Sequence, residues 1–197
     1  MDWTIALKGH VLEYLDDEHI YLCDGIILPS ITQILSVRFG KKYKDIDPEI
    51  LRKAAAKGTA VHEAIEAYCQ NGTESDLPEL RGFKFLQKNY GFEVLANELP
   101  VILFRGDKPI AAGRLDLVLK MNDVCCGADI KRTAALDKEQ VAYQLNLYRI
   151  AYRQCYGIEW TQIFALHLRD DVRQMVVLPI NEQMAWELVD EYERSEK

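Results

Sequence analysis

The stretch Gly113-Arg-Leu-Asp-Leu-Val-Leu-Lys-Met-Asn-Asp-Val-Cys-Cys-Gly-Ala-Asp-Ile-Lys-Arg-Thr133 alternates apolar and polar residues before it turns. Leu115, Leu117 and Leu119 recur at every second position, which is the period of a half-buried strand. The polar residues Met121-Asn-Asp123 suit a turn, and an apolar run follows them. The stretch therefore predicts a β-hairpin.

The predicted hairpin brings two carboxylates together. If its turn is centred between Asn122 and Asp123, antiparallel pairing sets Asp116 across from Asp129, with Cβ atoms about 4.5–5.5 Å apart, where like charges destabilise a sheet. Side chains alternate along a strand, so Lys131 shares a face with Asp129. A divalent cation would stabilise this cluster, because Mg²⁺ is held by one or two carboxylates with water and substrate phosphate. The hairpin predicts a metal site, whereas a slip of one residue in register would leave ordinary aspartates.

Composition and length favour one globular domain over residues 1–197. Hydrophobic residues make up 49% of the chain, enough to bury a core. The sequence has no run of eighteen apolar residues, and its N-terminus lacks the layout of a signal peptide, so we expect a soluble, cytoplasmic protein without a membrane partner. Five cysteines without a Cys-x-x-Cys pair argue against a disulfide framework and a structural zinc site.

Charge is unevenly distributed along the chain. The net charge is −7, whereas proteins that coat nucleic acid are usually basic. The segment from residue 38 to residue 57 has a surplus of +4, which leaves −11 for the rest. Its basic residues are Arg38, Lys41, Lys42, Lys44, Arg52, Lys53 and Lys57. Such a segment is either a solvated helix face or a strip that holds a phosphate backbone, with Lys53 and Lys57 as substrate-binding residues.

The other elements follow an order that is typical of a mixed sheet flanked by helices. Strands are expected in a hairpin over 14–28 that turns at Asp24-Gly25, and at 92–103, 161–168 and 173–178. Helices are expected from the N-caps Ser30 and Asp47, at 80–89, at 138–156, and from Asn181. The predicted fold class is α/β (α+β), with a mixed central β-sheet.

The helix that starts at Asp47 carries a candidate ligand. In it, Gly58 and His62 are one turn apart and share a face. A small residue beside a histidine lets a strand or a ligand approach. A single histidine is more commonly packed or exposed, so His62 by itself leaves both interpretations open.

The helix after the hairpin carries an unusual polar residue. Residues 141–152 are apolar almost all round, which predicts burial, yet Gln144 lies among them with Tyr148 one turn later. A buried amide must find hydrogen-bond partners. Gln144 is therefore either a bonded core residue or, with Tyr148, a lining residue of the cavity that holds the carboxylates.

Four motifs occur in a fixed order: Gly58-x-x-x-His62, Gly113-x-x-Asp116, Asp129-x-Lys131 and Gln144-x-x-x-Tyr148. Together they resemble the motif set of the RecB-like branch of the PD-(D/E)XK nucleases, which is similar in its core to phage lambda exonuclease. The resemblance leaves the N-terminal hairpin and the C-terminal strands and helix outside the core, as embellishments. It implies a restriction-endonuclease-like core and a metal-dependent DNA exonuclease of phage or mobile-element recombination and repair.

The resemblance also implies the roles of individual residues. Metal ligands for Mg²⁺ or Mn²⁺ would be His62, Asp116, Asp129, the backbone carbonyl of Ile130 and, as an additional ligand, Glu98. Lys131 would activate the attacking water and complete the catalytic centre with Asp116 and Asp129. Gln144 and Tyr148 would position the substrate. The relatives that hold an iron–sulfur cluster carry a late cysteine trio, so none is expected here, where Cys155 alone follows the hairpin.

The resemblance leaves partners and rival functions open. DNA is the implied partner, together with a recombination annealing protein, a separate helicase subunit or further copies of the chain. One rival is a nucleic-acid-binding or assembly protein that has kept the fold and lost turnover. Another is a structure-specific endonuclease or resolvase.

Overall fold

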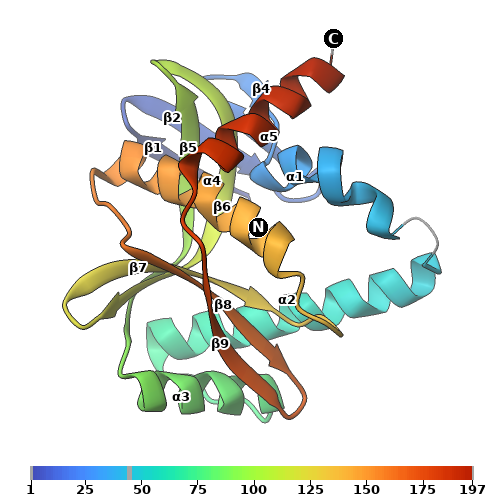
Figure 1. Cartoon of the computed structure of the whole chain (residues 1–197), viewed down its shortest axis with the longest axis vertical. Coiled ribbons are helices and arrows are strands. Elements are labelled where there is room, and N and C mark those ends of the chain that lie inside the picture. Colours follow the sequence, from blue (N-terminus) through green and yellow to red (C-terminus); the bar gives the residue numbers. More distant parts are fainter. Residues whose placement is uncertain (1, 44–45, 197) are drawn as a thin grey trace.

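The computed structural model describes residues 2–43 and 46–196, so Lys44 and Asp45 of the basic segment lie outside the described residues. The described chain forms a mixed α/β fold with two β-sheets and five α-helices (Figure 1). This confirms the predicted fold class, while the restriction-endonuclease-like character of the core stays a prediction. Within the described ranges, no helix is long and apolar enough to span a membrane.

Four short antiparallel strands form the N-terminal sheet. In spatial order they are β1 (Trp3–Leu7), β2 (His10–Leu15), β3 (Ile20–Cys23) and β4 (Ile26–Leu28). The strands β3 and β4 form a hairpin that turns at Asp24 and Gly25, as predicted. Both turn residues have positive φ, 51° and 78°, the conformation that a two-residue hairpin loop requires. The strands β2 and β1 extend this hairpin into a four-stranded sheet that the sequence pattern did not predict.

Five strands form the central sheet. Their spatial order is β5 (Glu93–Arg105), β6 (Lys108–Met121), β7 (Val124–Lys131), β8 (Gln162–Arg169) and β9 (Val172–Leu178). Neighbours are antiparallel except β7 and β8, which are parallel and are joined by the helix α4 (Lys138–Tyr156). The C-terminal strands are therefore not embellishments, because β8 lies directly beside β7. A parallel partner must be distant in sequence, since its connection needs a dozen or more residues.

The helices start and end close to the predicted positions. Besides α4 they are α1 (Ile31–Phe39), α2 (Pro48–Asn71), α3 (Pro78–Tyr90) and α5 (Glu182–Ser195), and the 3₁₀ turn η1 (Gly40–Tyr43) follows α1. Ser30 and Asp47 are the N-caps of α1 and α2, as predicted. The helix α2 continues through Gly58 and ends where Gly72 adopts a positive φ of 69°.

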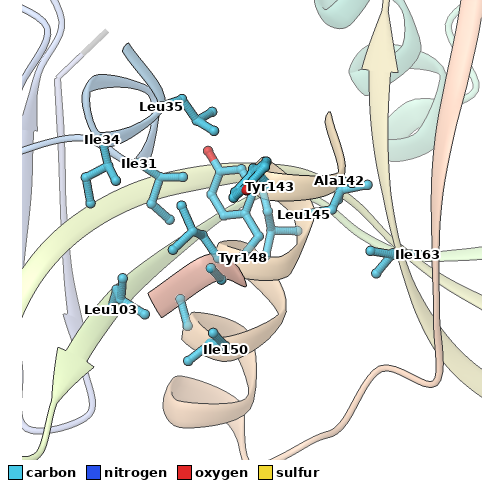
Figure 2. Close-up of a cluster of buried hydrophobic side chains, with 14 of the residues drawn as sticks. Ile31, Ile34, Leu35, Leu103, Ala142, Tyr143, Leu145, Tyr148, Ile150 and Ile163 are labelled. Carbon is cyan, nitrogen blue, oxygen red and sulfur yellow. The ribbon is translucent and has the colours of Figure 1, made fainter. Parts of the chain in front are cut away.

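Helices cover both faces of the central sheet. On one face, α1, α4 and α5 pack a core cluster that includes Ile31, Leu103 and Tyr148 (Figure 2). On the other face, α2 and α3 pack against β6, β7 and β8. Only the second half of α2 takes part, through Val61 and Ile65, and its first half extends away from the body of the molecule (Figure 1).

Candidate metal centre

The hairpin of β6 and β7 has the register that the sequence predicts. Met121 pairs with Val124 and Leu117 with Ala128. One more step in the same register sets Asp116 opposite Asp129. The backbone N–H of residue 130 donates a hydrogen bond of 2.7 Å to Oδ2 of Asp116, which fixes the orientation of this carboxylate. The two acidic side chains therefore converge between neighbouring strands.

A third carboxylate continues the row on β5. The pairs on either side of Glu98 place it opposite Asp116. Glu98 has a positive φ of 47°, which is uncommon for a residue other than glycine and occurs mostly at functional or structurally constrained positions. Its Oε2 lies 2.6 Å from Nε of Arg114. Three adjacent strands thus present carboxylates in one row, and Arg114 compensates part of their charge.

The helix α2 adds an imidazole to this row. In His62, Nδ1 lies 3.3 Å from Oε1 of Glu98 and 3.8 Å from Oδ1 of Asp116, while Nε2 lies 3.2 Å from the carbonyl oxygen of Ile130. One ligand atom from each of His62, Glu98 and Asp116 lies within 4.8 Å of the other two. The structure therefore brings together four of the groups that the resemblance assigns to a metal.

Surrounding carboxylates control the charge of His62. Burial by itself would lower the pKa of its imidazole, but the charges of Asp116 and Glu98 outweigh burial and raise the pKa to about 9. Without a metal, the imidazole is therefore protonated at neutral pH. A cation that binds this nitrogen must displace the proton.

Asp129 lies deeper than the other carboxylates and is 1% exposed. Its Oδ2 lies 2.7 Å from Nζ of Lys131, but no donor in the described part of the chain meets either oxygen at a hydrogen-bonding angle. Burial raises the pKa of Asp129, and the nearby Asp116 raises it further, against the opposing effect of Lys131. A buried carboxylate with so few donors is a group that a bound cation would stabilise.

One cavity of about 630 Å³ joins most of the predicted site residues. Its lining includes His62, Glu98, Asp116, Lys131, Gln144 and Tyr148. We call it the catalytic cavity, after the function that we propose for it below. The hydroxyl of Tyr148 interacts with the side chain of Gln144, and burial raises the pKa of Tyr148 well above its usual value. Of the two interpretations of Gln144, the structure favours the lining residue.

The two motif glycines have different physical roles. A Cβ atom at Gly113 would lie 2.9 Å from the Tyr148 ring, so this glycine lets the ring lie against β6. A Cβ atom at Gly58 would meet nothing within 4 Å. The expectation that Gly58 lets a strand approach is therefore wrong, and Gly58 instead borders an open groove beside His62.

Sequence reasoning missed the opposite wall of the catalytic cavity. It comes from the N-terminal sheet and from α1, which contribute Tyr14, His19, Tyr21, Ser30, Thr32, Gln33 and Ser36. Burial raises the pKa of Tyr21 to about 12. These residues carry no local motif that links them to the hairpin. Arg114 was missed as well, although its position two residues before Asp116 places both on one face of the strand.

Lys53 and Lys57 do not line the catalytic cavity. Nine residues, or two and a half helical turns, separate Lys53 from His62, so the two lie on opposite faces of α2. The Nζ of Lys53 lies 3.4 Å from Oε1 of Glu49. Ion pairs also compensate part of the charge of the basic segment, since Arg38 pairs with Glu191 and Lys42 with Asp137.

The donor set suits a hard divalent cation. Mg²⁺ and Mn²⁺ accept all the ligand types present here: two partly buried carboxylates, a fully buried carboxylate, a backbone carbonyl and an imidazole. The imidazole favours Mn²⁺ over Mg²⁺. The shortage of donors at Asp129 supports this fit. The residues present therefore fit the cation that the resemblance implies.

Comparison with known proteins adds little to this geometry. No model of a known protein family matches the sequence, and no curated protein matches it. Among solved structures, the fold is similar to the crystal structure of SSO0001, with 16% sequence identity and a TM-score of 0.47, over 85% of this chain and 75% of that one. The interpretation of the site therefore rests on the residues themselves.

Proposed function

We propose that this protein is a Mg²⁺- or Mn²⁺-dependent deoxyribonuclease that acts as an exonuclease in phage or mobile-element recombination and repair. The observation that carries the proposal is the convergence of His62, Glu98, Asp116 and Lys131 in one cavity, where Lys131 forms an ion pair with the buried Asp129. Such a cavity binds a cation and a phosphodiester next to a fixed ammonium. DNA is the proposed substrate, and the cytoplasm is the proposed compartment.

The bound cation would polarise the phosphodiester and lower the pKa of a coordinated water. The side chains of this protein supply the remaining functions. Asp129 holds the ammonium of Lys131 at the cavity wall, where it stabilises charge that develops on the attacked phosphate. Gln144 and the hydroxyl of Tyr148 offer hydrogen-bond donors to the phosphate from the facing helix.

The proposal is tested with end-labelled linear DNA in the presence of Mg²⁺, Mn²⁺ or a chelator. The parent protein should cleave with either cation and should stop when the chelator is added. Lys131→Ala should slow single-turnover cleavage by about 10²–10³, while its DNA affinity changes little, because the ammonium acts mainly on the transition state. The matched control is Lys120→Ala, since Lys120 is an exposed lysine of β6 that pairs with Asp123 in the turn.

Two results would contradict the proposal. One is cleavage by folded, metal-loaded Lys131→Ala at the parent rate. The other is DNA binding by the parent without any turnover, which would support the rival of a retired binding protein. That rival predicts a broken motif, whereas all four motifs are intact in the sequence, which supports the nuclease proposal. A recombination annealing protein, a helicase subunit or a second copy of the chain remains the proposed kind of partner.

A further inference from the structure

Two grooves adjoin the catalytic cavity on different sides. The first groove, of about 780 Å³, shares His62, Glu98 and Arg114 with the cavity. The second groove, of about 420 Å³, shares Lys131 with it. A strand of DNA that reaches the catalytic cavity therefore has two routes of approach, and their charges differ.

The first groove is strongly acidic, and we call it the acidic groove. The carboxylates among its described lining residues are Asp2, Asp16, Glu63, Glu66 and Glu98, against the guanidinium of Arg114 and, without a metal, the protonated imidazole of His62. Asp2 and Asp16 flank strands of the N-terminal sheet, Glu63 and Glu66 lie on α2, and Glu98 lies on β5, so several separate segments contribute acidic charge to the groove. A phosphate backbone that entered it would be repelled from several sides.

The second groove is basic on balance, and we call it the basic groove. The charged residues in its described lining are Lys131, Arg132, Arg169 and Asp137. Ion pairs with Glu79 and Asp170 hold Arg132 in place. One wall is the first half of α2, including Ala54, and Lys53 and Lys57 lie one residue before and three residues after Ala54 on the same helix. Both lysines are exposed, so they offer charge to a phosphate backbone along this route.

We propose that a DNA strand enters the catalytic cavity through the basic groove and that the acidic groove stops its end. The cavity between the grooves then holds the terminal nucleotides, and the bond that lies at Lys131 is close to a terminus. A covalently closed strand would have to continue through the acidic groove and is excluded. This inference rests on the proposed nuclease function and adds the route by which the strand enters and the groove that stops its end.

The test compares linear and covalently closed circular single-stranded DNA of the same sequence, each incubated with Mn²⁺. The parent should degrade the linear strand and leave the circle intact. The double variant Glu63→Gln with Glu66→Gln neutralises one wall of the acidic groove without touching the proposed ligands. It should raise the ratio of circle cleavage to linear cleavage about tenfold or more, the scale on which charge alters access to a cleft.

A matched control carries the same change of charge elsewhere. Glu187→Gln with Glu193→Gln neutralises two glutamates of α5, which lies far from α2 (Figure 1), and should leave the ratio unchanged. Asp16→Asn, in a different segment that lines the acidic groove, provides a second independent variant and should change the ratio in the same direction. Thermal unfolding would establish that each variant is folded before its ratio is compared.

The outcomes separate this inference from the proposed function. Cleavage of the circle by the parent at the linear rate would overturn the two-groove route and the exonuclease part of the proposed function, and would leave metal-dependent cleavage of DNA standing. An unchanged ratio in both folded acidic-groove variants would also overturn the two-groove route. Absence of cleavage of either DNA by the parent would instead contradict the proposed function, and the inference with it.

Discussion

The two walls of the catalytic cavity are built in different ways. The carboxylate wall consists largely of the β6–β7 hairpin, whose strands are joined by a turn of two residues and pair in a register that local alternation predicts. The facing wall consists of the N-terminal sheet and α1, which lie roughly seventy residues or more before the hairpin in the chain. The comparison shows that the two aspartates and the lysine of this site are locally encoded, while the other proposed ligands and the shape of the cavity depend on distant segments.

The largest effect is expected at the carboxylate wall. Asp116→Asn removes an anionic ligand while nearly preserving its shape, so Mn²⁺ binding and cleavage should fall together, with a loss of about 10²–10³ or more in rate. Calorimetry with Mn²⁺ measures the first effect and single-turnover cleavage the second. Asp123→Asn is the control, since Asp123 lies exposed in the turn of the same hairpin. Unchanged Mn²⁺ affinity in Asp116→Asn would remove the metal from this wall.

The second-largest effect is expected where the ring of Tyr148 packs against Gly113 of β6. Gly113→Ala places a methyl group 2.9 Å from the Tyr148 ring, so the ring or β6 must shift. Overpacking of this kind typically costs about 1–3 kcal/mol of unfolding free energy, measurable by chemical denaturation. Gly58→Ala is the matched control, because its methyl group enters open space and should stabilise α2 by about 0.5–1 kcal/mol. Equal effects at both glycines would show that Tyr148 does not depend on Gly113.

The third effect concerns the proton on His62. Because neighbouring carboxylates raise the pKa of His62 to about 9, cation binding near neutral pH must release this proton. The affinity for Mn²⁺ should therefore rise about tenfold per pH unit between pH 6.5 and pH 8, and level off as the pH approaches 9. Calorimetry in buffers with different ionisation enthalpies counts the released proton. In His62→Gln this pH dependence should disappear, and its persistence would show that His62 is not a ligand.

The smallest effect is expected from the basic groove. The double variant Lys53→Ala with Lys57→Ala should weaken DNA binding. The slope of the logarithm of the binding constant against the logarithm of the salt concentration should become shallower by about 0.7–0.9 for each phosphate contact that is lost. Single-turnover cleavage at saturating DNA should stay close to the parent rate, because neither lysine lines the catalytic cavity. Lys88→Ala on α3 is a control for the loss of one surface charge. A salt dependence equal to that of the parent would remove both lysines from the DNA route.

Prediction from sequence succeeded where neighbours in the chain are also neighbours in space. The caps at Ser30 and Asp47, the turn at Asp24 and Gly25, and the hairpin register all depend on residues within a few positions of one another. It located the strand β8 but did not predict its parallel pairing with β7, which spans the whole of α4. A parallel pair has no tight turn whose residues could predict it, because its strands are joined by a long crossover. The partner strand is instead determined by how the crossover helix packs on the sheet.

The sequence by itself determined that Asp116, Asp129 and Lys131 converge, since strand periodicity and one tight turn are sufficient for that result. Only the tertiary structure decided that Glu98 completes the row, that α2 places His62 against it, and that the N-terminal sheet closes the opposite side. The physical reason is the range of the interactions. Backbone pairing and caps act over a few residues, whereas cavity walls form when burial of apolar surface brings together elements that are far apart in the chain.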